Sequence, residues 1–593
     1  MIHEALVHTG GHPDVYLKDR KTMVLTVKAA RKDLTACTII YWSRTTPDQI
    51  KRGNMKCVYR DARFDYFRIE IEFSKVARYQ KYYFQVESPS EICYLTDHGV
   101  YHTVPDDGFY EFLYVNGTDT IRIPQWSRGM VYYQIFPDRF CNGSTQNDPA
   151  DCREWGTAPT RENYMGGDLQ GIIDKVDYLQ ELGVDCIYLN PVFKADFNHK
   201  YATTDYFEID PIFGDAEAMH LLIKKLHEKK IRIVLDGVFN HVGIHFKQFQ
   251  DVLQKQENSG YKDWFYITRY PVEVSHHCYE CVGAYKWMPK LNTANPEVRE
   301  FILQVMTYWI DEFHIDGWRL DVADEVDESV WVQARILLKD KNPDLLLLGE
   351  TWGSGLRLMA GNQMDSIMNY MFLDAVRDFI AYAKIDASEF DSRINKMLSQ
   401  YPEMMNQAMF LPLDSHDTER FINYCDQDIQ KFKLAVALQM FFVGSPAIYY
   451  GDEVGITGEN DPDCRKCMVW DAEEQNRELL GFYQSLTALR KQKSCIKAGS
   501  YAVNLCQGRL YGFIRYQEKE AIYLILNTGS EEEAAMVPVF SQTRYQDCLG
   551  ADTWEADHIT NPDECTNRDM FPYQGVIHMT LKPYSLRIVE EKL

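Results

Sequence analysis

The sequence lacks three features that would each define a class of protein. It has no run of about 20 consecutive apolar residues, which a membrane-spanning helix needs, and no basic segment followed by an apolar one near residue 1. It also lacks a basic excess, since 63 Lys and Arg stand against 87 Asp and Glu, a net charge of −24 that repels nucleic acid and anionic membranes. We therefore expect a cytoplasmic protein with no membrane and no nucleic-acid partner, acting on a neutral, soluble ligand.

Glycine and proline are not abundant, at 34 and 22 of 593 residues, which argues against disorder and low-complexity repeats. The 15 cysteines are an odd number scattered along the chain, which is typical of reduced thiols rather than of a disulfide framework. Two Cys-x-x-Cys pairs imitate a zinc site, Cys278–Cys281 beside two histidines and Cys464–Cys467. We interpret both pairs as free thiols.

The middle of the chain alternates apolar runs of strand length with amphipathic helices. Helices are predicted over 215–229 and 297–313, where apolar residues recur on one face. Eight apolar runs are candidate strands: 131–137, 184–191, 231–238, 317–323, 345–351, 366–372, 409–417 and 447–453. Strand and helix repeated eight times over about 330 residues predict a (β/α)8 TIM barrel.

Short β-rich runs lie on both sides of this region, so the chain predicts three domains. Residues 1–123 predict an N-terminal β-sandwich, residues 124–500 the barrel, and residues 501–593 a C-terminal antiparallel β-sandwich domain. Within the barrel, the interval 242–295 is too long for a simple connection after the third strand. We expect it to form a loop-rich subdomain over the C-terminal face of the barrel.

Charged residues follow four of the predicted strands. Because barrel strands are buried on both faces, charges at their C-terminal ends indicate catalysis rather than solvation. The clusters are Asp236 with His241, Arg319 with Asp321, Glu350, and His416 with Asp417. A buried ion pair accounts for any single Asp–Arg pair equally well, but four clusters on one rim favour an active site.

Two of these carboxylates are predicted to differ in pKa. Residues 319 and 321 share one face of a strand, so Arg319 should hold the pKa of Asp321 down. Glu350 follows four leucines, and burial should raise its pKa. An ionised nucleophile beside a protonated acid suits glycoside hydrolysis, with the carboxyl groups ~5–5.5 Å apart if the anomeric configuration is retained.

The same segments resemble a known family. In chain order, LDGVFNH (235–241), GWRLDVADE (317–325), LGET (348–351) and SHD (415–417) resemble the four signature segments of the α-amylase superfamily. Further segments, MPKLN (288–292), NHKYATTDY (198–206) and DPDCRKCMVWD (461–471), resemble its neopullulanase, cyclomaltodextrinase and maltogenic amylase branch. The resemblance covers nearly the whole chain.

The resemblance implies a role for each candidate residue. Asp321 would be the nucleophile, Glu350 the general acid/base, and Asp417 the residue that supports the transition state. The substrate-binding residues would be Tyr201, Asp236, His241, Arg319 and His416 around the reacting sugar, with Asp461 and Arg465 further out. A structural calcium ion would bind Asn142, Ser144, Asn147, Asp148, Gly166 and Asp168, whose oxygens suit a hard cation. A polar surface loop is the alternative for that segment, and no organic cofactor is implied.

The activity implied is that of a retaining α-glycoside hydrolase. It would cleave α-1,4-glucosidic bonds in cyclodextrins, pullulan and maltooligosaccharides, with α-1,6 cleavage left open and some transglycosylation. The alternatives are a transglycosylase-dominated relative and a catalytically silent glucan-binding protein. Asp324 and Gly353 depart from the usual residues near the acceptor side, which leaves the ratio of hydrolysis to transfer open. The N-terminal domain implies a homodimer, as in the branch.

Overall fold

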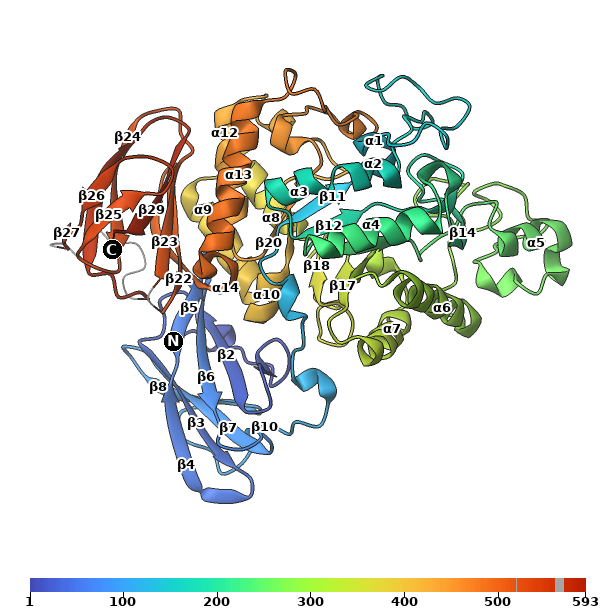
Figure 1. Cartoon of the computed structure of the whole chain (residues 1–593). Helices are drawn as coiled ribbons and strands as arrows, with labels where there is room; N and C mark the ends of the chain where they lie inside the picture. Colours follow the sequence, from blue (N-terminus) through green and yellow to red (C-terminus); the bar gives the residue numbers. More distant parts are fainter. Residues whose placement is uncertain (519, 560–569, 593) are drawn as a thin grey trace.

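The chain forms an N-terminal β region, a central parallel barrel and a C-terminal β region (Figure 1). This computed structural model describes residues 1–518, 520–559 and 570–592. No helix among these residues is both long enough and apolar enough to cross a bilayer. The fold class predicted from the sequence is therefore confirmed, with antiparallel sheets on either side of a TIM barrel.

The N-terminal region packs two antiparallel sheets around a core of its own, which includes Leu25, Ile39 and Phe84. One sheet has the order β1 (Val15–Leu17), β2 (Thr22–Ala30), β6 (Phe64–Glu72) and β5 (Lys56–Arg60). The other has the order β4 (Thr46–Asn54), β3 (Ala36–Ser43), β7 (Gln80–Glu87), β8 (Ile92–Thr96) and β9 (Gly99–Tyr101), with β10 (Tyr110–Phe112) also paired to β7.

The barrel contains eight parallel strands, each overlapping one predicted run. They are β11 (Tyr132–Ile135), β12 (Cys186–Leu189), β15 (Arg232–Gly237), β16 (Gly317–Leu320), β17 (Leu346–Gly349), β18 (Ser366–Ile367), β19 (Phe410–Pro412) and β20 (Ser445–Tyr449). The hydrogen-bonded order runs from β18 through β17, β16, β15, β12, β11 and β20 to β19. Between β18 and β19, the bridge that links the two ends within the described chain is the single pair Met368 and Phe410.

Strand β18 is much shorter than its predicted run, 366–372. The side chain of Asn369 accepts the backbone N–H of Phe372 and caps helix α8 (Tyr370–Val376). An Asn side chain in this position satisfies an N–H group that the helix leaves unpaired. The helix therefore begins inside the apolar run and ends the strand.

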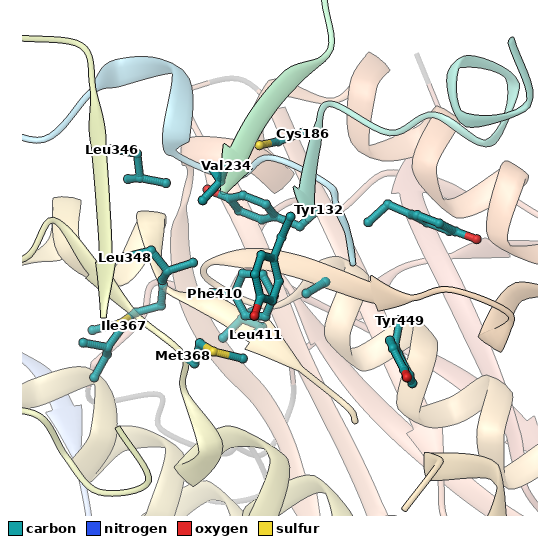
Figure 2. Packing of buried hydrophobic residues seen from close by; sticks show 14 of the residues in the cluster. Tyr132, Cys186, Val234, Leu346, Leu348, Ile367, Met368, Phe410, Leu411 and Tyr449 are labelled. Atoms are coloured by element: carbon teal, nitrogen blue, oxygen red, sulfur yellow. The ribbon is translucent and has the colours of Figure 1, made fainter. Parts of the chain in front are cut away.

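Alternation along the strands separates an apolar layer from a polar one. Figure 2 shows the apolar layer, in which the rings of Tyr132 and Phe410 lie 5.1 Å apart beside Val234 and Leu348. Since side chains two residues apart share a face, Asp236 follows Val234 and Glu350 follows Leu348 on the same side, nearer the C-terminal ends of the strands. The apolar layer is thus the floor of a polar site.

Helices surround the barrel, and both predicted helices are present as α4 and α6. The helices are α1 (Pro137–Phe140), α2 (Leu169–Asp174), α3 (Val176–Leu182), α4 (Ala216–Glu228), α5 (Lys247–Lys255), α6 (Pro296–Phe313), α7 (Glu328–Lys341), α8, α9 (Ala387–Ser399), α10 (Glu403–Ala408), α11 (Phe421–Tyr424), α12 (Ile429–Phe441), α13 (Arg477–Gln492) and α14 (Ser494–Ala498). A hairpin of β13 (Phe193–Ala195) and β14 (Thr203–Ile209) follows β12. The interval 242–295 contains α5 and extends away from the rest of the barrel, as Figure 1 shows.

The C-terminal region also has two antiparallel sheets. One has the order β21 (Ser500–Gln507), β22 (Leu510–Gln517), β23 (Glu520–Asn527), β29 (Ser585–Glu591), β25 (Arg544–Asp547) and β26 (Thr553–Glu555); the other has β24 (Glu533–Val539), β28 (Gly575–Leu581) and β27 (Asp557–His558). Tyr511 of β22 donates to Asp391 of α9 at 3.1 Å, which joins this region to the barrel. The cysteines in the described ranges, fourteen in all, are free thiols.

Candidate active site

A single buried guanidinium connects three of the predicted acidic residues. Nη1 of Arg319 lies 2.9 and 3.1 Å from the two carboxylate oxygens of Asp236 and 2.8 Å from Oδ1 of Asp321. Nη2 of the same side chain lies 2.9 Å from Oε2 of Glu350. Arg319 and Asp236 are fully buried, and Asp321 and Glu350 nearly so. The polar residues at the C-terminal ends of three neighbouring strands, β15, β16 and β17, therefore meet around one guanidinium.

Burial controls the protonation of this cluster. It raises the pKa of Glu350, as predicted, and also raises the pKa of Asp236. The prediction for Asp321 is wrong: burial raises its pKa well above the ordinary value, and the Arg319 charge offsets only part of that shift. Because one guanidinium faces three carboxyl groups, the cluster favours holding a proton at neutral pH.

The backbone after β16 is shaped to hold Glu350. Val322 has a φ of 45°, a left-handed conformation that is strongly disfavoured for a β-branched residue and costs about 1–3 kcal/mol. In this conformation its N–H donates to Oε2 of Glu350 at 2.9 Å. Both this contact and the contact with Arg319 fall on Oε2, so Oε1 is the oxygen that is available to carry a proton.

A second group of contacts joins β12, the β13–β14 hairpin and β19. The rings of Tyr201 and His416 stack with centroids 5.4 Å apart and an interplanar angle of 2°. The Tyr201 hydroxyl donates to Oδ2 of Asp236 at 2.8 Å and lies 2.6 Å from Nε2 of His416. The Tyr188 hydroxyl donates to the same Asp236 oxygen at 2.6 Å. Asp236 therefore fixes the positions of both tyrosine side chains by accepting their hydroxyl hydrogen bonds.

Buried amides determine which nitrogen of His416 carries the proton. Nε2 of Gln134 donates to Nδ1 of His416 at 2.7 Å and to Oδ1 of Asn190 at 3.0 Å. Nδ1 is then an acceptor, so the ring proton resides on Nε2, facing Tyr201 and Oδ2 of Asp417 at 3.1 Å. Burial lowers the pKa of His416 well below its ordinary value, which keeps the ring neutral.

The remaining substrate-binding candidates continue outward from His416. Arg465 donates from Nε to the His416 carbonyl at 2.9 Å, and its guanidinium lies 3.4 Å from Asp417 and 2.9 Å from Asp461. The Asp417 side chain is 31% exposed, so it faces solvent at the mouth of the site. His241 is buried, which lowers its pKa to about 4, and the backbone of Tyr201 offsets part of that shift.

Sequence reasoning missed several residues that complete the site. Gln134 lies on β11, Tyr188 lies on β12, and Asn190 directly follows β12. Their signal was a polar atom within or directly after an apolar run. Trp352 follows Glu350 by two residues, is 56% exposed, and stacks on Tyr370 at 4.1 Å with an interplanar angle of 9°. This exposed indole, two residues from Glu350, presents an apolar face on which another ring can stack.

The predicted calcium residues form two adjacent groups with different hydrogen-bonding roles. Asn142 donates to Asp148 at 2.9 Å while its own Oδ1 is buried without a partner, and a side chain at Gly166 would collide with both residues. Asp168 accepts N–H groups from Gly143, Ser144, Gly171 and the Asn147 amide, and it caps α2. The first group fits a hard cation through oxygen ligands, whereas the second is engaged as a helix cap.

Comparison with known proteins agrees with this geometry. Residues 134–499 match the family model described as alpha amylase, catalytic domain, and residues 1–116 match alpha amylase, N-terminal ig-like domain. The chain belongs to the α-amylase family. Within that family it is 38% identical to neopullulanase 2 of Thermoactinomyces vulgaris over 596 residues, 98% of each chain. It is 43% identical to the intracellular maltogenic amylase of Bacillus subtilis (strain 168) over 426 residues, 71% of this chain and 72% of that one.

The fold of this α-amylase family member matches a solved structure over its whole length. A structure named cyclomaltodextrinase superposes with a TM-score of 0.92 at 36% identity and covers 100% of both chains. The protein is a glycoside hydrolase of the cyclomaltodextrinase, neopullulanase and maltogenic amylase type. The family, fold and enzyme class predicted from the sequence are confirmed.

Proposed function

We propose that the protein is a retaining hydrolase of α-1,4-glucosidic bonds in cyclodextrins, pullulan and maltooligosaccharides, with some transfer to sugar acceptors. The observation that carries this proposal is the pair of carboxyl groups, Asp321 and Glu350, held on adjacent nitrogens of Arg319. A retaining mechanism needs two carboxyl groups that act together, one as the nucleophile and one as the acid and base. The substrate classes follow the names of the relatives, cyclomaltodextrinase and neopullulanase.

The proposed mechanism uses the shared proton of the cluster. Oε1 of Glu350 gives its proton to the glycosidic oxygen while Asp321 attacks the anomeric carbon, and the electron pair of the broken bond stays with the departing oxygen. Glu350 then takes a proton from water, whose oxygen attacks the same carbon and releases Asp321. Arg319 contacts both carboxyl groups, and we propose that the proton of the cluster resides on Glu350 when substrate is bound, which leaves Asp321 as the ionised nucleophile.

The remaining residues are proposed to hold the sugar. Asp417 faces solvent with its carboxylate beside the neutral His416, so it is placed to accept hydrogen bonds from sugar hydroxyls. Arg465 and Asp461 extend this polar wall. Tyr201, Asp236 and His241 form the buried side of the proposed sugar site, where Asp236 is fixed by two tyrosine hydroxyls.

We further propose that a structural calcium ion binds through Oδ1 of Asn142, Asp148 and the Gly166 carbonyl. Asp168, with Ser144 and Asn147, holds the adjoining loop. The unpartnered Oδ1 of Asn142 supports this proposal. Calcium titration of EDTA-treated protein should raise the melting temperature, and Asn142→Ala should abolish the rise; an equal rise in both proteins would contradict the proposal.

The proposed setting is a cytoplasmic homodimer. The relative named intracellular maltogenic amylase supports the location. The N-terminal β region, which matches the family's N-terminal domain model, is the proposed dimer contact. Sedimentation equilibrium that finds only monomer across the working concentration range would remove the dimer from the proposal.

Initial rates on β-cyclodextrin, pullulan and soluble starch, with Glu350→Gln as the blank, test the proposed function. We expect cyclodextrin to be cleaved faster than starch and the first product to carry the α-anomer, which NMR detects before mutarotation. Starch cleaved fastest would contradict the substrate assignment. Glucan binding without product would instead identify a silent binding protein, and transfer products in excess over hydrolysis would identify a transglycosylase.

A further inference from the structure

Four side chains that commonly bind metals gather at one edge of the N-terminal region, away from the barrel strands. His3 lies in a 3-10 turn, His3–Ala5; Glu91 directly precedes β8; Cys93 lies within β8; and His102 directly follows β9. The hairpin register pairs Tyr94 with Tyr101, so the next pair along it brings Cys93 opposite His102. Segments about 90 residues apart in the chain thus meet at one thiol.

His3, Glu91 and Cys93 lie at distances typical of metal ligands, and His102 lies close to two of them. Sγ of Cys93 lies 3.7 Å from Nε2 of His3, 3.6 Å from Nδ1 of His102 and 3.5 Å from Oε2 of Glu91. Oε1 of Glu91 lies 3.3 Å from Nε2 of His3. In tetrahedral zinc sites, with Zn–S of about 2.3 Å and Zn–N of about 2.0–2.1 Å, ligand atoms lie about 3.3–3.6 Å apart.

Three side chains converge on one thiol. A carboxylate and two imidazoles all approach the Cys93 sulfur, and carboxylate, imidazole and thiolate are all groups that zinc takes as ligands. One ligand atom each from His3, Glu91 and Cys93 lies within 4.8 Å of the others. A cation at the centre would satisfy all of these acceptors at once.

The surroundings of the cluster also suit a bound ion. Cys93 is buried, whereas the His102 side chain is 72% exposed, so an ion has a path from solvent to the thiol. The α-amino group of Met1 lies 3.1 Å from Oε1 of Glu91. That contact orients the carboxylate so that its other oxygen, Oε2, faces the sulfur and His102.

We propose that His3, Glu91, Cys93 and His102 bind one zinc ion that ties the His3–Ala5 turn to the β8–β9 hairpin. One thiolate and two imidazoles favour zinc over calcium or magnesium, which prefer oxygen ligands. The Cys93 thiol gives up its proton to solvent when the ion binds. The proposed role of the ion is structural: His3, Glu91 and Cys93 bind it, and His102, beside Cys93, completes the set as the fourth ligand, so no position is left for a substrate.

Cobalt substitution in the full-length protein tests this proposal directly. EDTA-treated protein, returned to excess calcium so that oxygen-rich sites are occupied, is titrated with Co²⁺ and followed by absorption. We expect about one equivalent to give the thiolate charge-transfer band and the intense visible bands of tetrahedral cobalt, with zinc displacing it. Cys93→Ser should abolish the charge-transfer band. His102→Ala should weaken cobalt binding by at least about 10–100-fold, because the loss of a residue that only supports a metal ligand already costs that much.

Two further variants separate loss of the metal from loss of the fold. Because Cys93 is buried and its replacement can disturb folding, the exposed His102 supplies a variant with an intact core. Cys281→Ser is the matched control, since Cys281 lies 3.8 Å from Nδ1 of His276 in the other cysteine–histidine group. Wild-type protein that takes up no stoichiometric cobalt, or a band that survives in Cys93→Ser and His102→Ala, would overturn the proposal. If the band disappears only in Cys281→Ser, the metal is bound by the Cys281–His276 group instead, and this result would also overturn the proposal.

Discussion

Replacing Gln134 by leucine tests whether the buried amide network controls catalysis. Gln134 is buried, and its side-chain nitrogen donates to Nδ1 of His416 at 2.7 Å and to Oδ1 of Asn190 at 3.0 Å. Leucine has a similar volume, so the substitution removes these two hydrogen bonds without opening a large cavity. Two buried acceptors then lose their donor.

The expected magnitude follows from those two acceptors. Leaving a buried polar group unsatisfied costs about 1–3 kcal/mol, so the folded state should lose about 2–6 kcal/mol of stability. Without the Gln134 donor, the His416 proton can move to Nδ1, and Nε2 can no longer donate toward Tyr201 and Asp417. If one such contact is lost in the transition state, kcat/KM should fall about 10–100-fold, at 1.36 kcal/mol per factor of ten.

The assay compares kcat/KM on β-cyclodextrin with the free energy of unfolding for two leucine variants. Gln439→Leu is the matched control, because Gln439 is equally buried and its amide donates to the carbonyls of Leu411 and Ala447 at 2.8 and 2.9 Å, without contacting His416. Both variants should lose stability, but only Gln134→Leu should lose activity beyond what its folded fraction explains. Equal kcat/KM in the two variants would refute the reasoning about His416.

Three further predictions follow from the structure. Asp321→Asn should abolish turnover yet leave the protein at least as stable at neutral pH, because burial raises the pKa of Asp321 and its ionised form therefore costs stability above the unfolded-state pKa; kinetics and thermal melting check both parts. Burial raises the pKa of Asp391 to about 7, so stability should fall as pH rises from about 4 to 7, and Asp391→Asn should remove that slope in urea unfolding without changing kcat. Trp352→Ala should cost about 0.5–1.5 kcal/mol of stability, the usual value of an aromatic stack such as the one with Tyr370, and should lower the yield of transfer products in chromatography; an unchanged product ratio would exclude sugar stacking there.

The barrel and its polar rim could be predicted because side chains two residues apart share one face of a strand, so the sequence itself shows which residues point the same way. On β15 an apolar residue lies two positions before the polar one, as Val234 precedes Asp236, and Leu348 of β17 likewise precedes Glu350. Parallel strands in a closed sheet must then bring these ends together. The contacts of Arg319 with three acids were a consequence of that topology.

Other properties depend on quantities that no local pattern contains. The pKa of Asp321 was predicted in the wrong direction because burial and the Arg319 charge oppose each other, and only the packed structure shows which effect is larger. Gln134 could not be recognised as a partner of His416, since 282 residues separate them. The left-handed backbone at Val322 contradicts the preference of its own residue type, so sequence reasoning excludes it.

The single bridge between Met368 and Phe410 gives the barrel a seam. Every other junction around the ring is a ladder of at least two residue pairs, within the part of the chain described, whereas this one has a single pair beside the two-residue strand β18. Local opening begins where the fewest backbone hydrogen bonds must break, so amide exchange should be fastest along this junction. His416 and Asp417 follow β19 by a few residues, so opening of the seam would loosen one wall of the proposed sugar site. Asp236 and Arg319 lie on β15 and β16, which do not border the seam.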